Sequence, residues 1–252
     1  MSSNEASGND EKTGTSKGLI GSAVVVAAIV LLGLVVSLTN LIGGKDEQQP
    51  PAQAATTSSA ATGTANPSAP DDASVCGLTD VKPTGAVSAP PEAMWALVGT
   101  IAAPRIDGQG PGNLQKNGFR DCYARTPTGA LLAAANYIAV VSDPALTKDA
   151  VTKLVAESVG RNYALEHLRD VSPQPADLRM QIAGFKVLAY TEDRASVDLV
   201  FRTAPQPALV SQVVDVVWQA GDWKVQPSDT GGFLAPAHSI DSLSGYLVWS
   251  GA

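Results

Sequence analysis

One aspartate in the sequence is surrounded by apolar residues, where a charged side chain is unfavourable. Asp215 stands in the stretch VVDVVW, and an acid buried in such apolar surroundings is unfavourable unless it is paired or functional. A carboxylate that faces a tyrosine could act as a general base while the tyrosine stabilises an enolate-like oxyanion. Tyr137, Tyr163 and His167 lie where helices are expected. These three residues and Asp215 are therefore the candidate pocket residues.

An ion pair explains Asp215 without any catalysis, and we prefer that explanation. On the predicted hairpin, Asp215 lies diagonally across from Lys224, with which it could pair on the open side of a sheet, and structural ion pairs also perturb carboxylates. We therefore predict no catalytic residue. A small-molecule-binding or isomerase-type domain with Asp215 as its base stays as an alternative.

Other signatures of chemistry are missing from the sequence. His167 and His238 are the only histidines, and neither has a partner at metal-ligand spacing. From Cys76 onward no serine stands in a G-x-S-x-G motif, and GQGPGN (108–113) has the glycines of a phosphate loop without its Lys-Ser/Thr. We predict that the protein uses no metal and no cofactor and is not an enzyme.

The two cysteines, Cys76 and Cys122, are expected to form a disulfide because neither has a metal-binding partner nearby. A loop of this size would stabilise the domain by roughly 4 kcal/mol in the chain-entropy model. Such a bond lasts only in an oxidising compartment. The alternative is a pair of buried free thiols.

Two tryptophans flank the dipeptide Ala220-Gly221. If that dipeptide is a two-residue loop, Trp218 lies opposite Trp223 on one face of a hairpin. A three-residue loop with Gly221 in a bulge would send Trp223 to the other face. We choose the first register because it gathers the large apolar groups on one buried face. All the tryptophans are interpreted as fold markers: Trp95, Trp218, Trp223 and Trp249.

The elements that position these residues are helices first and antiparallel strands afterwards. A helix is predicted from Thr126, an N-cap followed by proline, to the Asp-Pro pair at 143–144. A second helix is expected over 147–160, followed by a short third helix. From residue 180 to 226 apolar residues alternate, which predicts four strands, with a bulge at Gly184. This order is typical of an α+β domain.

An apolar run precedes the domain. Residues 19–42 carry no charge, and about 20 such residues suffice to cross a bilayer. The alternative is a secretory signal peptide, although the run exceeds the roughly 7 to 15 apolar residues of such peptides. Lys12 and Lys17 before the run against Lys45 alone after it indicate a cytoplasmic N-terminus. We predict a single-pass protein of the cell membrane whose C-terminal domain is extracytoplasmic.

Composition divides the chain further. Residues 46–74 contain no aromatic or large aliphatic side chain, which is typical of an extended linker. The glycine- and proline-rich segment after it is expected to wrap over the domain without a sheet of its own, and the apolar C-terminal residues are expected to dock. The predicted parts are a cytoplasmic tail (1–18), a transmembrane helix (19–42), a disordered linker (43–75), an irregular wrapping segment closed by the disulfide (76–125), the α+β domain (126–227) and a docked C-terminal segment (228–252).

The charge of the chain argues against nucleic acid as a partner. The formal net charge is −7, and 17 basic residues are scattered among 24 acidic ones. From Cys76 onward, 14 basic residues stand against 17 acidic ones. Binding along a phosphate backbone needs a basic stripe, which the sequence lacks.

The helices followed by strands that end in W…GDWKV resemble the nuclear-transport-factor-two-like (cystatin-like) fold over about residues 126–227. On an N-terminal membrane anchor, this resembles assembly proteins of type IV secretion and the transfer protein C of Gram-positive conjugative elements. The stretch CYARTPTGALLAAANY (122–137), the Trp95 segment and SLSGYLVWSG (242–251) are similar to uncharacterised actinobacterial membrane proteins of integrative conjugative elements. The resemblance implies a cone of about three helices on a curved antiparallel sheet.

The resemblance also implies a function. It predicts a non-catalytic, membrane-anchored assembly component of a conjugative, type-IV-like transfer machine, with envelope and transfer-complex proteins as partners. Repetition within such a machine predicts a homo-oligomer. An accessory subunit of a lipid-import system, where a similar cone on a membrane helix occurs, is the alternative of the same class.

Overall fold

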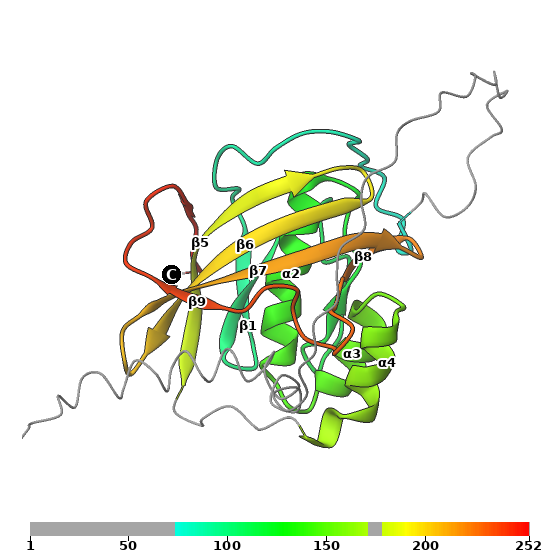
Figure 1. Cartoon of the computed structure of the whole chain (residues 1–252). Helices are drawn as coiled ribbons and strands as arrows, with labels where there is room; N and C mark the ends of the chain where they lie inside the picture. The colour runs from blue at the N-terminus through cyan, green and yellow to red at the C-terminus, as the bar shows by residue number, and fades with distance from the viewer. Residues whose placement is uncertain (1–73, 171–177, 252) are drawn as a thin grey trace, which may run out of the picture.

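A curved antiparallel sheet packs against one central helix in the computed structural model (Figure 1), which describes residues 74–170 and 178–251. The strands run in the spatial order β10-β5-β6-β7-β8, and β9 also pairs with β7. With three α-helices beside the sheet, the predicted α+β class is confirmed. The predicted membrane helix and all but the last two residues of the predicted linker (43–75) lie outside the described residues. The strands of the sheet are β5 (Arg179–Tyr190), β6 (Arg194–Ala204), β7 (Leu209–Gln219), β8 (Asp222–Val225), β9 (His238–Ile240) and β10 (Leu247–Val248).

The central helix is α2 (Pro127–Val141), and it begins as the sequence predicts. The Thr126 hydroxyl accepts a hydrogen bond from Gly129 N–H (2.9 Å), and Pro127 occupies the first turn. Gly129 is required here, because a Cβ would lie 1.9 Å from the carbonyl oxygen of Ala124. Nearly every residue of α2 is buried. A helix that is apolar all round is typical of a core position between two layers.

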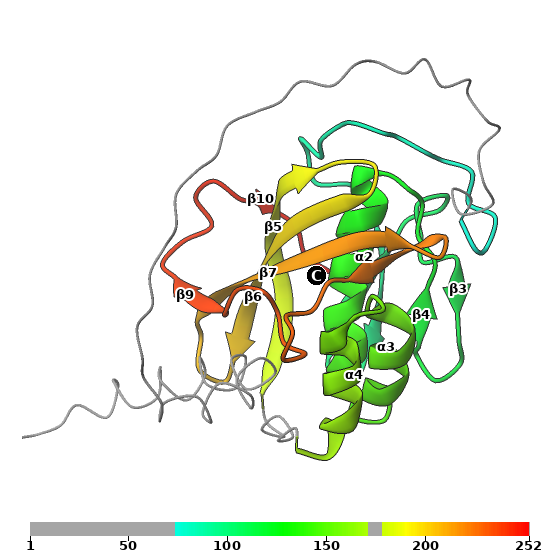
Figure 2. The same cartoon turned by 45° about the vertical axis from the view of Figure 1, so that its right-hand side comes forward.

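The second predicted helix is interrupted. α3 (Thr147–Leu154) ends where Val155 becomes extended and forms a bridge with Val225 of β8. Ser158 then caps α4 (Val159–Glu166) by accepting a hydrogen bond from the N–H of Arg161. The two helices lie next to one another beside α2 (Figure 2). A short 3-10 turn, η2 (Leu168–Asp170), follows them.

The register of the tryptophan hairpin is confirmed. Trp218 pairs with Trp223, and Val216 pairs with Val225. Ala220 and Gly221 both have positive φ, 53° and 75°, as the central residues of a type I′ turn require. Trp223 is 1% exposed, and the two indoles are in contact. Trp223 therefore belongs to the core, and the partly buried Trp218 packs against it.

The bulge predicted at Gly184 is confirmed as well, since the pairing of β5 with β6 shifts between Ile182 and Gly184. A second shift lies between Val187 and Ala189. Such bulges bend a strand and increase its twist. They help β5 to curve around α2.

The prediction of an irregular segment over 76–125 is wrong, although the disulfide that closes it is confirmed. The segment contains two antiparallel hairpins of its own, and one of them packs against α2. Six of its glycines and prolines lie between the short strands, at Gly99, Gly108, Gly110, Pro111, Gly112 and Gly118. The strands are β1 (Met94–Val98), β2 (Ile101–Arg105), β3 (Asn113–Leu114) and β4 (Arg120–Asp121).

The C-terminal segment docks on the domain, as predicted. β9 pairs with β7 and β10 pairs with β5, so the chain between them crosses over β6 (Figure 1). During this crossing the Tyr246 hydroxyl donates to Oδ2 of Asp198 on β6 (2.7 Å). The segment then ends with Trp249 packed against Phe185 and its Nε1–H donating to the Pro91 carbonyl (2.9 Å).

Trp95 joins the C-terminal segment to the β1–β2 hairpin, so its removal is expected to destabilise the domain. Its ring meets the ring of Trp249 at a centroid distance of 4.8 Å, and Gly251 lies against it. A fully buried tryptophan costs about 3 to 5 kcal/mol when truncated. Because Trp95 is half-buried, we expect about 2 kcal/mol for Trp95→Ala in denaturant unfolding. The exposed neighbour Met94 is the control: Met94→Ala should change little, and equal effects would contradict the packing role of Trp95.

Candidate functional site

The four candidate pocket residues do not come together. Val214 and Val216 of β7 are buried in the core, so Asp215 between them points to the opposite face of the sheet. Tyr137 lies on α2 and packs against Phe233. Tyr163 and His167 stack on each other along α4, with ring centroids 3.9 Å apart. Asp215 is thus separated by the sheet from the tyrosine on α2.

Tyr137 is set up as a structural residue rather than as an acid. Burial raises the pKa of its hydroxyl to about 12. Phe233, which belongs to the segment after β8, covers its ring edge-on at 6.0 Å between centroids. The hydroxyl therefore keeps its proton at physiological pH.

Lys224 does not pair with Asp215, contrary to the structural explanation that the sequence suggested. Its ammonium lies 3.0 Å from Oδ2 of Asp222, two residues away on the same strand. The register places Lys224 opposite Val217, and its side chain extends along β8 rather than diagonally across to β7. Asp222 is therefore the acid of this hairpin that needs a partner.

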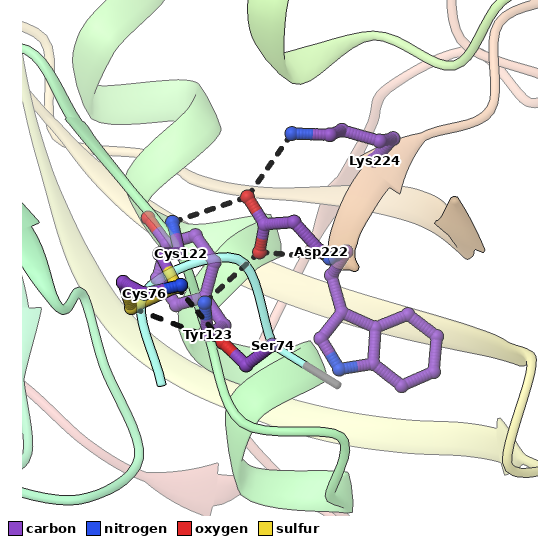
Figure 3. The surroundings of a disulfide bond; sticks show 7 residues. Ser74, Cys76, Cys122, Tyr123, Asp222 and Lys224 are labelled. Carbon is purple, nitrogen blue, oxygen red and sulfur yellow. Dashed lines mark hydrogen bonds and ion pairs between the residues drawn. A yellow bond between two sulfur atoms is a disulfide. The ribbon is translucent and has the colours of Figure 1, made fainter. Parts of the chain in front are cut away.

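Asp222 is the most deeply buried carboxylate among the described residues, with 0% exposure. The type I′ turn places it at the start of β8, and its side chain reaches a chain segment about a hundred residues earlier. Its Oδ2 accepts a hydrogen bond from Cys122 N–H (3.1 Å), and its Oδ1 accepts one from Tyr123 N–H (2.9 Å). Figure 3 shows the carboxylate between these two amides and the ammonium of Lys224.

The disulfide lies next to this carboxylate (Figure 3). Cys76 N–H donates to the sulfur of Cys122 (3.2 Å), and the Ser74 hydroxyl lies 2.9 Å from the same sulfur. Val75 N–H donates to the carbonyl of Gly221 at the hairpin tip (2.9 Å). The first described residues are thereby fixed both to the disulfide and to the hairpin. We call the group Cys76, Cys122, Asp222 and Lys224 the disulfide clamp.

Burial of the disulfide clamp opposes the ionisation of Asp222. Burial raises the pKa of Asp222 above its ordinary value of 3.8, although Lys224 and the two backbone amides act in the opposite direction. Burial, together with the negative charge of Asp222, raises the pKa of Tyr123 well above its ordinary value. Both oxygens of Asp222 are occupied by donors. The arrangement can position chain segments, but it presents no free base to a substrate.

The raised pKa predicts how stability depends on pH. The unfolded chain loses the Asp222 proton near pH 3.8, whereas the folded chain keeps it to a higher pH. Between these two values the folded state binds more protons, so the contribution of Asp222 to stability falls as pH rises. Compared with Asp222→Asn, which does not titrate, the wild type should lose unfolding free energy as pH rises through this window. Denaturant unfolding at a series of pH values measures the unfolding free energy of both proteins. If the wild-type value minus the Asp222→Asn value rises with pH in this window, the prediction is contradicted.

Sequence reasoning missed Asp222. In AGDW the aspartate reads as an ordinary turn residue, and no local pattern shows that it accepts hydrogen bonds from Cys122 and Tyr123. The only available signal was its place beside a two-residue turn that itself predicted a buried hairpin. Contacts over such a sequence distance depend on tertiary packing.

The described residues contain no group of three or more histidine, cysteine, aspartate or glutamate side chains that could hold a metal ion. None of the helices within 74–170 and 178–251 is long and apolar enough to cross a membrane. The apolar run at 19–42, on which the membrane prediction depends, lies outside these residues.

Comparison with known proteins relates the chain to a family of domains. A family model described as a domain of unknown function (DUF8175) matches residues 55–248. No curated protein and no solved structure matches the chain. The match covers well over half of the 252 residues and includes both cysteines of the disulfide clamp. The chain therefore belongs to the DUF8175 family of domains of unknown function.

Proposed function

We propose that this protein is a membrane-anchored, extracytoplasmic interaction component of a conjugative, type-IV-like transfer machine, without catalytic activity. The observation that carries the proposal is the Cys76–Cys122 disulfide at the start of the described domain. Disulfides persist in oxidising compartments and are rare in the cytosol. An apolar run at 19–42 that precedes such a domain fits an anchor with the domain on the outer side.

The absence of a catalytic role is part of the proposal. It is supported by the separation of Asp215 from Tyr137 and by the use of both Asp222 oxygens within the disulfide clamp. A general base must come within hydrogen-bond reach of the proton that it removes. Asp215 and Tyr137 cannot serve one ligand from opposite sides of the sheet. This favours an interaction module over the isomerase-type alternative.

The conjugative context is supported by the resemblance of residues 122–137 and 242–251 to membrane proteins of integrative conjugative elements. We also propose that the α+β domain is a cone of the nuclear-transport-factor-two-like type, because α2 packs on the concave side of a bent sheet (Figures 1 and 2). Partners would bind the outer faces of the helices and the hairpins within 76–125. Exposed apolar side chains occur in both places, at Val159 and at Leu97.

Purification of the full chain from its native membrane tests this function. In a mild detergent, we expect transfer ATPases and other subunits of a conjugation channel to travel with the chain, identified by mass spectrometry. Residues 1–75 joined to an unrelated domain are the matched control, because they retain the predicted anchor without the folded domain. Permeases and lipid-binding subunits would instead support the lipid-import alternative. Recovery of neither class above the control would contradict an envelope-complex role.

A further inference from the structure

Unpaired strand edges invite pairing with another chain, and folded proteins usually cover them. The edge at β8 is covered. Val155 forms a bridge with Val225, and Ala156 N–H donates to the Val225 carbonyl (2.8 Å). The connection between α3 and α4 therefore closes this end of the sheet.

The outer edge of β2 is closed in a different way. Ala102 N–H donates to Oε1 of Gln181 on β5 (3.0 Å), and the Pro104 carbonyl accepts from Nδ2 of Asn136 on α2 (2.9 Å). Pro104 itself has no N–H to leave unpaired. Side chains thus bind the outward N–H of Ala102 and the outward C=O of Pro104.

The outer edge of β1 differs from both. Gly99 and Thr100 form a two-residue turn between Val98 and Ile101, so that closing pair is hydrogen-bonded and the pattern alternates from there. The backbone N–H and C=O groups of Trp95 and Leu97 consequently point away from β2. Among the described residues, no hydrogen bond reaches them.

The side chains of β1 leave this edge accessible. Leu97 is 72% exposed and Met94 is 51% exposed, and Ala96 between them is exposed too. The strand MWALV carries no charge. Charged residues and prolines are the usual means of blocking an edge strand, and β1 has neither.

We propose that β1 pairs with β1 of a second copy of this chain, antiparallel and with the two-fold axis at Ala96. In this register, Trp95 lies opposite the partner's Leu97, and the two exchange both backbone hydrogen bonds. Symmetry repeats the exchange for Leu97 and the partner's Trp95. Ala96 faces the partner's Ala96 as a non-hydrogen-bonded pair, where the two backbones approach most closely and a small side chain fits best.

A second copy fits this edge better than a charged peptide would. The domain carries an excess of acidic residues, yet β1 presents no charge that would attract a basic segment or repel an identical strand. A two-fold contact uses the same surface on both subunits and therefore closes at two copies. Closure also removes the hazard of open-ended strand addition.

Tethering strengthens the pairing. This step rests on the proposed function, because copies anchored in one membrane meet at a raised effective concentration. The pairing surface itself belongs to the folded domain. Pairing of β1 with β1 would give the predicted homo-oligomer a defined strand and register.

Cross-linking of the full chain in its membrane tests the proposal. Ala96→Cys places one thiol on each side of the two-fold axis, at a distance that a disulfide can span between non-hydrogen-bonded strand residues. We expect a covalent dimer on non-reducing gels after mild oxidation. Leu114→Cys on β3 is the matched control, because Leu114 is also an apolar strand residue with 51% exposure.

A second substitution separates edge pairing from random collision. Leu97→Pro removes an N–H that points away from β2, and proline is tolerated at such edge positions. Combined with Ala96→Cys, it should reduce the covalent dimer to the level of the Leu114→Cys control. Leu97→Lys should do the same by placing a charge at the edge, and formation of the native Cys76–Cys122 bond reports folding for both variants.

Two outcomes would overturn the proposal. One is an Ala96→Cys dimer no more abundant than the Leu114→Cys dimer, and the other is an Ala96→Cys dimer that Leu97→Pro and Leu97→Lys leave unchanged. The cross-link is read on this chain alone. Its failure is therefore distinct from failure of the proposed function, which is read from the proteins that co-purify.

Discussion

Replacement of both cysteines by serine is expected to lower the free energy of unfolding by about 4 kcal/mol. The bond joins Cys76 to Cys122 across 46 residues, and the crosslink removes loop-closure entropy from the unfolded chain. The closed segment includes both hairpins of 76–125, so the packing of β1 and β2 against α2 also depends on the bond. Denaturant unfolding of the purified full chain measures the loss.

Reduction provides the control for this prediction. Reductant should lower the unfolding midpoint of the wild type toward that of the doubly substituted chain. It should leave the midpoint of the doubly substituted chain unchanged. Equal midpoints for the oxidised wild type and the variant would show that the disulfide does not contribute to stability.

Asp222→Ala is the second change with a large expected effect, a loss of roughly 3 to 5 kcal/mol. The alanine would leave the N–H groups of Cys122 and Tyr123 buried without their acceptor. It would also leave the ammonium of Lys224, whose side chain is largely buried, without its counter-charge. Removal of one partner from a buried ion pair costs more than the pair itself contributes.

Asp215→Ala is the matched control for Asp222→Ala. Both aspartates belong to the same hairpin, but Asp215 points to the open face and is only half-buried. Surface substitutions of this kind usually change stability by less than about 0.5 kcal/mol. If the two alanine variants unfold at the same midpoint, the disulfide clamp does not hold the hairpin as described.

The disulfide clamp also predicts coupling between its members. Asp222 binds the backbone of Cys122, so the cysteines and the carboxylate act on the same chain segment. Residues in one network have non-additive effects on stability. Asp222→Ala should therefore cost less in the chain without the disulfide than in the wild type, and equal costs would show that the two act independently.

The hairpin register was predictable because one face of it is buried. The apolar side chains of Trp218 and Trp223 can share that face in only one of the two loop lengths, and the structure has this pairing. The bulge at Gly184 was predictable for the same reason, since the alternation slips there by one residue. Period-2 patterns specify a strand well when its two faces differ in polarity.

The strands of 76–125 were not predictable in this way. β1 exposes residues on both faces, and β2 is largely buried, so neither strand alternates cleanly. β3 and β4 are only two residues long each. The interruption between α3 and α4 likewise depends on Val155 pairing with Val225, a contact that no local pattern reports.

The candidate site also depends on a tertiary contact that no local sequence pattern reports. The sequence drew attention to Asp215 because of its apolar neighbours alone, and it missed Asp222 of the same hairpin. Alternation sends Asp215 to the open face, whereas Asp222 is buried by the segment that carries the disulfide. Which acid is buried is decided by the arrival of Cys122 and Tyr123, and chain order does not reveal it.

We propose that the disulfide-closed domain lies outside the cytoplasm, and thiol labelling of intact cells tests this position most directly. A membrane-impermeant reagent should label Cys76 and Cys122 only after treatment with a membrane-impermeant reductant. The bond that joins them explains the requirement for reduction, and in the proposed external position neither reagent would need to enter the cell. Labelling without reductant would contradict the disulfide in the cell, and labelling that appears only after lysis would contradict the external position of the domain.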